Sequence, residues 1–114
     1  IVGFPSETDE DFEDTCALAR RVGFSKIHVF PYSKREGTPA AARADQVPPE
    51  VKAARAARLR ALSDELAAAD RAARAGTIEL ALVETPETAT AESYHEAPAP
   101  AGAKIGSLVP VKVG

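Results

Sequence analysis

Residues 1–32 read IVGFPSETDEDFEDTCALARRVGFSKIHVFPY and predict a strand, a helix and a second strand in succession. The apolar start followed by a polar turn is typical of a strand that leads into a helix. Thr8 is expected to cap this helix with Asp11 in the capping-box position, and Gly23 is expected to end it. The largely apolar run KIHVFPY, residues 26–32, favours a strand of a parallel sheet covered on both faces. The segment therefore predicts a βαβ unit and an α/β fold class.

A long helix is predicted next, from about Pro49 to Ala75, because proline suits a first turn and Gly76 suits a helix end. Its apolar side chains recur at helical spacing. The residues expected on its inner stripe are Val51, Arg55, Arg58, Leu59, Leu62, Leu66, Ala69 and Ala73.

The chain changes character after Gly76. TIELALVE, residues 77–84, alternates as a strand does, and ATAESYHEA and SLVPVKV are two further strand candidates. Three short strands after a long helix predict a small β-barrel or a part of one. We therefore expect two domains, residues 1–75 and residues 76–114.

Composition limits the possible functions. The net charge of −3 falls in residues 76–114, because acidic and basic side chains balance in residues 1–75, and this argues against a strongly basic nucleic-acid binder. The single cysteine, Cys16, excludes an internal disulfide and a cysteine-only metal site. The sequence contains neither an apolar run long enough to span a membrane nor a signal-peptide pattern, so we expect a cytoplasmic protein with no membrane partner.

The turn GFPSET is the first candidate ligand site, since ligands of parallel α/β sheets bind beyond the carboxyl ends of the strands. Gly3 lets the backbone approach a ligand, Pro5 fixes the turn, and Glu7 and Thr8 present polar groups at a helix N-terminus. The alternative is that this segment is only a well-capped turn.

The second candidate site follows residues 26–32 at the same sheet edge. Tyr32 and Ser33 are expected to face the cleft, Lys34 and Arg35 to meet phosphates, and Thr38 to lie in a tight turn beside Gly37. A solvated loop with incidental charges is the alternative.

Other polar residues favour structural interpretations. His28 is expected to be a hydrogen-bonded structural histidine, Cys16 a small core residue, and Arg55, Arg58 and Arg60 a solvated helix face rather than a nucleic-acid contact. No nucleophile–base pair, metal-ligand cluster or phosphate-binding glycine loop is recognisable, so no catalytic residue is predicted.

The segments IVGFPSETDEDFEDT and HVFPYSKREGTPAA resemble consecutive segments of radical S-adenosylmethionine methylthiotransferases. The HVFPYS form is most similar to the tRNA threonylcarbamoyladenosine branch of that family. RLRALSDELAAAD and the strands after Gly76 resemble the family's connector and its TRAM domain, a small RNA-binding β-barrel. The resemblance thus implies the last strands and helices of a partial radical α/β barrel followed by a TRAM-like barrel.

The resemblance also implies a function for the complete enzyme, which is the addition of a methylthio group to the modified adenosine beside the tRNA anticodon. S-adenosylmethionine and iron–sulfur clusters are the implied cofactors, and the cluster cysteines are not in this chain. Gly3, Pro5, Glu7 and Thr8 match the cofactor side of the barrel, and Ser6 stands where the family usually has glycine. The substrate-binding residues at the barrel mouth are Tyr32, Ser33, Lys34, Arg35 and Thr38.

The chain is accordingly expected to be a C-terminal fragment whose partners are tRNA and the missing N-terminal portion of the same enzyme. Two alternatives stay open: a stand-alone RNA-binding module, and an inactive truncated product. A CxxxCxxC motif encoded upstream in frame would favour the enzyme.

Overall fold

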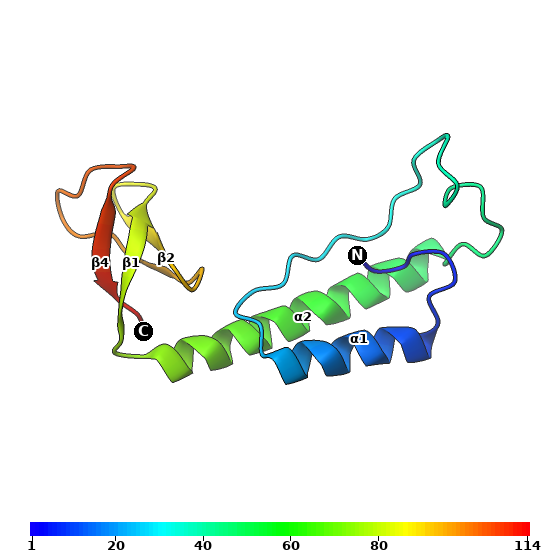
Figure 1. Cartoon of the computed structure of the whole chain (residues 1–114), viewed down its shortest axis with the longest axis horizontal. Helices are drawn as coiled ribbons and strands as arrows, with labels where there is room; N and C mark the ends of the chain where they lie inside the picture. Colours follow the sequence, from blue (N-terminus) through cyan, green and yellow to red (C-terminus); the bar gives the residue numbers. More distant parts are fainter. The chain divides into compact units, whose positions relative to one another are not determined.

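The computed structural model describes residues 1–114 as two helices followed by a four-stranded sheet (Figure 1). The chain divides into two compact units. The N-terminal unit comprises residues 1–23 and 27–64, and the C-terminal unit comprises residues 24–26 and 65–114. The division falls within the long helix, and the domain boundary near Gly76 stays a prediction.

Helix α1, Asp9–Val22, begins and ends as its sequence predicts. The Thr8 hydroxyl accepts the Asp11 N–H, and the Asp11 carboxylate accepts the Thr8 N–H, each at 3.0 Å. These two bonds complete a capping box, which satisfies backbone donors that the helix itself leaves free. Gly23 ends the helix in the left-handed conformation, with a φ of 69°.

Helix α2 spans Pro49–Arg74, and its part up to residue 64 belongs to the N-terminal unit, where it lies beside α1 (Figure 1). Phe12, Cys16 and Ala19 are buried on the inner face of α1, which confirms Cys16 as a small core residue, and Val22 at the end of the helix is 55% exposed. On α2 the buried residues are Arg55, Ala56, Leu59, Leu62 and Ser63. The stripe predicted for α2 is therefore correct at its centre.

Three residues of the predicted α2 stripe are exposed. Arg58 projects outward and forms an ion pair with Glu13 of α1. Ala69 and Ala73 lie toward the C-terminal end of α2, in the C-terminal unit. Leu59 and Leu62 are buried, and they lie in the part of α2 that belongs to the N-terminal unit together with α1.

The two strands predicted before α2 are reduced to one parallel bridge, between Val2 and Pro31. The Val2 N–H donates to Phe30 O at 3.0 Å, and the Tyr32 N–H donates to Val2 O at 2.7 Å. The direction of the pairing is as predicted, but the strands are not. Pro31 has no N–H to donate, and Phe30 is 63% exposed rather than covered on both faces.

The C-terminal unit contains an antiparallel sheet of β1 (Ile78–Val83), β2 (Thr88–Ala91), β3 (Glu96–Pro98) and β4 (Leu108–Lys112). The strand order is β3-β2-β1-β4, so β3 and β4 are edges and the sheet is open. We expected a small β-barrel or a part of one; the sheet does not close into a barrel, and its open antiparallel arrangement is consistent with a TRAM-like region. Both edge strands carry a proline, Pro98 and Pro110, and a strand without that backbone donor extends a ladder poorly.

ATAESYHEA, predicted as one strand, is a hairpin of β2 and β3. The Tyr94 N–H donates to Ala91 O at 2.8 Å, and the Ala91 N–H donates to His95 O at 2.9 Å. Tyr94 has a φ of 68°, a conformation that usually selects glycine at this position of a hairpin loop.

Small side chains fill the covered face of the sheet. The core consists of Ala81, Val83, Ala89, Ala91, Ala97, Val111 and Val113. In β1 the larger residues Ile78, Leu80 and Leu82 are 66%, 47% and 41% exposed, so the alternation holds but the bulky side chains point outward.

A polar cluster joins the end of α2 to the sheet. His95 Nε2 lies 2.8 Å from Asp70 Oδ2, and Arg74 Nε donates to the same oxygen at 2.7 Å. Arg71 Nη2 donates to Glu96 O at 2.7 Å. The hydrogen bond with His95, followed by that of Arg74, holds the pKa of Asp70 below its ordinary value.

Replacement of Tyr94 by glycine should raise the free energy of unfolding by about 1 kcal/mol, because glycine adopts a positive φ without the steric cost of a Cβ. Urea denaturation of the C-terminal unit measures this difference. Tyr94→Asn should also raise the free energy of unfolding, and Tyr94→Val should lower it. Equal stability of the glycine and valine variants would contradict the assigned backbone conformation.

Asp70→Asn should flatten the acid limb of the stability curve. A carboxyl whose pKa is lowered by folding stabilises the protein above its unfolded pKa of about 3.9, and that stabilisation is lost as the pH falls through the folded value. Wild-type unfolding free energy should therefore drop more steeply below about pH 4 than that of the variant. Asp64→Asn is the control, since it makes the same replacement at an exposed position of α2 outside the cluster of Asp70, Arg74 and His95.

Candidate functional site

A pocket of about 540 Å³ lies in the N-terminal unit, between the GFPSET turn and the loop that follows Pro31. Its lining residues are Ile1, Phe4, Phe30, Pro31, Tyr32, Ser33, Arg35, Thr38 and Ala40. The cavity brings Phe4 of the GFPSET turn together with residues of the second candidate site, whereas none of the predicted cofactor residues Gly3, Pro5, Glu7 and Thr8 lines it. Four of the five predicted substrate-binding residues line it, and the exposed Lys34 does not.

Two aromatic rings meet in this pocket, one from each segment. The ring centroids of Phe4 and Tyr32 are 5.3 Å apart at an interplanar angle of 72°, an edge-to-face contact. The Tyr32 hydroxyl is buried without a hydrogen-bond partner in the chain. The walls are therefore largely apolar, and Arg35 is their one ionised side chain.

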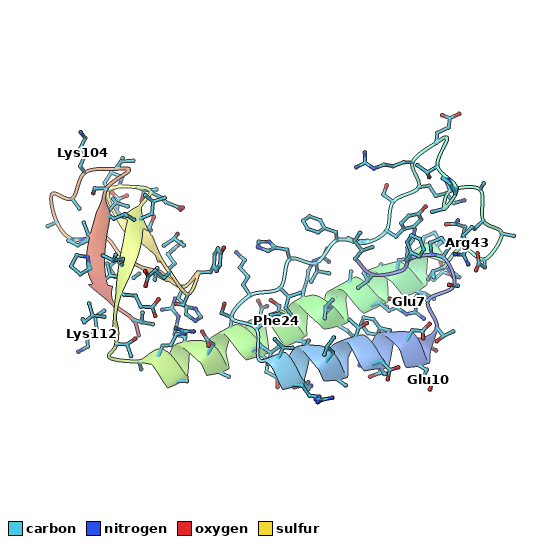
Figure 2. The ribbon with its side chains drawn as sticks, in the orientation of Figure 1. Glu7, Glu10, Phe24, Arg43, Lys104 and Lys112 are labelled. Atoms are coloured by element: carbon cyan, nitrogen blue, oxygen red, sulfur yellow. The ribbon has the colours of Figure 1, made fainter.

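The GFPSET turn is held from within by Glu7. Its carboxylate oxygen Oε1 accepts the Gly3 N–H at 2.9 Å and a hydrogen bond from Arg55 Nη1 at 2.8 Å. Arg55 Nη1 also donates to Glu7 O at 2.9 Å, and Arg55 Nη2 donates to Asp9 Oδ1 at 2.8 Å. Figure 2 labels Glu7 beside the start of α1. These bonds fix the turn that carries Phe4.

Lys52 occupies the space beside Gly3. A Cβ placed on Gly3 would lie 2.1 Å from Lys52 Cγ, and Gly3 has a φ of 76°, so both space and conformation demand glycine there. Lys52 Nζ donates to Tyr32 O at 3.1 Å and lies 5.6 Å from the Tyr32 ring centroid. The close approach that we predicted at Gly3 is thus made by a lysine side chain of α2.

The loop after Pro31 is ordered by short-range hydrogen bonds. The Thr38 hydroxyl donates to Arg35 O at 2.7 Å, and Gln46 Nε2 donates to Ala40 O at 2.8 Å. Arg43, labelled in Figure 2, pairs with Asp45 at 2.7 Å. These contacts give the loop a defined shape, with Thr38 placed at the pocket wall.

The predicted cofactor residues are engaged within the chain. Gly3 and Glu7 bond to each other, Pro5 is buried, and Thr8 caps α1. Their assignment to S-adenosylmethionine stays a prediction, and Ser6 is exposed. No group of three potential metal ligands occurs in the chain, and Cys16 is buried alone, so these residues do not fit an iron–sulfur cluster.

Sequence reasoning missed the roles of Lys52 and Arg55. Arg55 was assigned to the inner stripe of α2 and also to a solvated cationic face, and the structure buries it to 7% exposure. A charged residue among the leucines of an apolar stripe is a signal for a buried ion pair, because an unpaired buried charge is costly. No helix of the chain is both long and apolar enough to cross a membrane.

Ser6 has a φ of 75°, an uncommon conformation for a residue with a Cβ. Ser6→Gly should raise the free energy of unfolding of the N-terminal unit by about 1 kcal/mol. Ser6→Ala keeps the Cβ and should leave stability near that of the wild type. Thermal denaturation of the three proteins tests this expectation, which fails if alanine stabilises as much as glycine.

No family model matches the sequence. The tRNA-2-methylthio-N(6)-dimethylallyladenosine synthase of Methylococcus capsulatus is 57% identical over 84 residues, which are 74% of this chain and 18% of that protein. The enzyme of the same name from Geobacillus thermodenitrificans is 52% identical over 84 residues, 74% of this chain and 16% of the relative. That of Bacillus thuringiensis is 60% identical over 67 residues, 59% of this chain and 13% of the relative.

The chain thus spans less than a fifth of the length of these relatives. Their names support the methylthiotransferase resemblance but not the threonylcarbamoyladenosine branch that the HVFPYS form suggested. Over part of its length, this chain is homologous to the tRNA-2-methylthio-N(6)-dimethylallyladenosine synthases, which are radical S-adenosylmethionine methylthiotransferases.

Proposed function

We propose that this chain is the C-terminal part of a cytoplasmic tRNA methylthiotransferase and that its pocket helps to bind the adenosine that is modified. The observation that carries the proposal is that the GFPSET turn and the loop after Pro31, the two segments of the family resemblance, build one aromatic pocket. High sequence identity to the named synthases supports the same assignment.

The chemistry of the pocket favours an apolar substituent on the base. Phe4, Phe30 and Tyr32 offer ring surfaces, and burial of apolar area in such a pocket is favourable. The dimethylallyl group is a small branched hydrocarbon that suits these rings, and it is the group in the names of the relatives, whereas the threonylcarbamoyl group carries a carboxylate for which Arg35 is the one cation in the wall. We therefore assign the dimethylallyl-modified adenosine as the substrate.

Arg35 is the pocket residue best suited to the nucleic-acid backbone. Its guanidinium is exposed and forms the charged part of an otherwise apolar wall. Guanidinium groups bind phosphate oxygens well, and each such contact adds to the salt dependence of tRNA binding. In the complete enzyme, S-adenosylmethionine and iron–sulfur clusters would supply the radical chemistry, and this chain contributes substrate binding.

A chimeric enzyme tests the proposal. The matching 84-residue segment of the Methylococcus capsulatus relative is replaced by that of this chain. The chimera should convert dimethylallyladenosine in tRNA to its methylthio derivative, detected by mass spectrometry of the digested tRNA. Phe4→Ala and Phe30→Ala should each lower kcat/KM roughly fivefold, because an aromatic contact is worth about 1 kcal/mol.

Leu18→Ala is the matched control, since Leu18 is 58% exposed on α1 and does not line the pocket. It should leave kcat/KM unchanged. Arg35→Ala should weaken tRNA binding and reduce its salt dependence. A chimera that modifies only threonylcarbamoyl-bearing tRNA would overturn the substrate assignment. Unchanged kcat/KM in both phenylalanine variants would show that the pocket does not bind the substrate.

A further inference from the structure

Two cations on one face of α2 contact the two segments that contribute Phe4 and Tyr32 to the pocket. Lys52 and Arg55 lie three residues apart, and residues at this spacing are neighbours on a helix surface. Lys52 bonds to the backbone of Tyr32, and Arg55 bonds to the backbone and carboxylate of Glu7. Neither cation lines the pocket itself.

The Arg55 contacts set the position of Phe4. Glu7 Oε1 receives both the Arg55 guanidinium and the Gly3 N–H, so the guanidinium, the carboxylate and the residue preceding Phe4 form one connected group. The side chains of Arg55 and Glu7 are 9% and 13% exposed, so solvent screens this ion pair little. The GFPSET turn is therefore anchored to α2.

The Lys52 contacts set the position of Tyr32. Its ammonium reaches the Tyr32 carbonyl while its stem lies against Gly3, so one side chain touches both segments that build the pocket. The same two segments are joined directly where Val2 bonds to Phe30 and Tyr32. The edge-to-face contact of Phe4 and Tyr32 lies between these anchors.

We propose that Lys52 and Arg55 are positioning residues of the pocket, which hold Tyr32 and Phe4 in the edge-to-face arrangement that forms part of its wall. This inference rests on the proposed function. It assigns no contact between either cation and substrate. The rival account is that both residues only stabilise the fold, as the Arg58–Glu13 pair on the outer surface does.

The test uses the 114-residue chain and N6-dimethylallyladenosine as the probe, with binding followed by NMR titration. Lys52→Met keeps the aliphatic stem over Gly3 and removes the ammonium. Arg55→Lys keeps the charge and removes the planar fork that serves several acceptors. Each variant should raise the Kd of the probe about fivefold or more.

Amide exchange supplies a readout that needs no ligand. Exchange of the Tyr32 N–H should accelerate about tenfold in Lys52→Met, and exchange of the Gly3 N–H should do so in Arg55→Lys, because each amide loses the anchor of its own segment. Arg58→Met is the control on the same helix: it removes an ion pair whose partners are 56% and 57% exposed. It should change neither the Kd nor these two exchange rates.

Unchanged Kd and exchange in Lys52→Met overturn the proposal, even if Arg55→Lys does not fold. An equal rise of Kd in Arg58→Met also overturns it, because the effect would then follow general stability. If the wild-type chain does not bind the probe, the ligand assignment of the proposed function fails, and the exchange rates alone decide whether the cations position the two segments.

Discussion

The buried guanidinium of Arg55 is the constraint on which the N-terminal unit depends. It enters the interior from an otherwise apolar stripe of α2, where an unpaired charge would be strongly destabilising. Its fork finds the Glu7 carbonyl, the Glu7 carboxylate and the Asp9 carboxylate, and only Nε lacks a partner. Asp9 is 96% exposed, so the Glu7 contacts matter most. These contacts fix the start of α1 and the turn before it relative to α2. Because that turn carries Phe4, they also position part of the pocket wall.

Local signals made both helices predictable. The Thr8–Asp11 capping box and the glycine at position 23 act within a few residues, so the sequence alone indicates the bounds of α1. Strands lack such local definition, because each ladder needs a neighbour that the sequence does not specify. Residues 26–32 read as a buried strand on composition, yet they make only the Val2–Pro31 bridge. The apolar character of Phe30 instead serves the pocket.

In the sheet, too, the sequence predicted individual strands but not how they pair and pack. Strands β1 and β4 were predictable from alternation, but alternation does not say which face is covered, and the face with Ala81 and Val83 is the inner one. The open sheet was not predictable, because closure into a barrel depends on whether the two edge strands pair, which the sequence does not specify. In the site, the convergence of the two loop segments followed from topology, whereas Lys52 acts through a contact between α2 and a distant loop that no local pattern reveals.

The burial of Cys16, the one cysteine of the chain, makes its thiol a probe of helix separation. Cys16 lies on the inner face of α1, and desolvation raises the pKa of its thiol, so the reactive thiolate is scarce in the folded protein. An alkylating reagent therefore reaches it when α1 separates from α2. With no second cysteine to compete, the rate of Cys16 labelling reports the opening of the helix pair in a chain that contains no tryptophan. Cys16, which cannot by itself bind a metal cluster, can therefore be used to measure how often α1 and α2 separate.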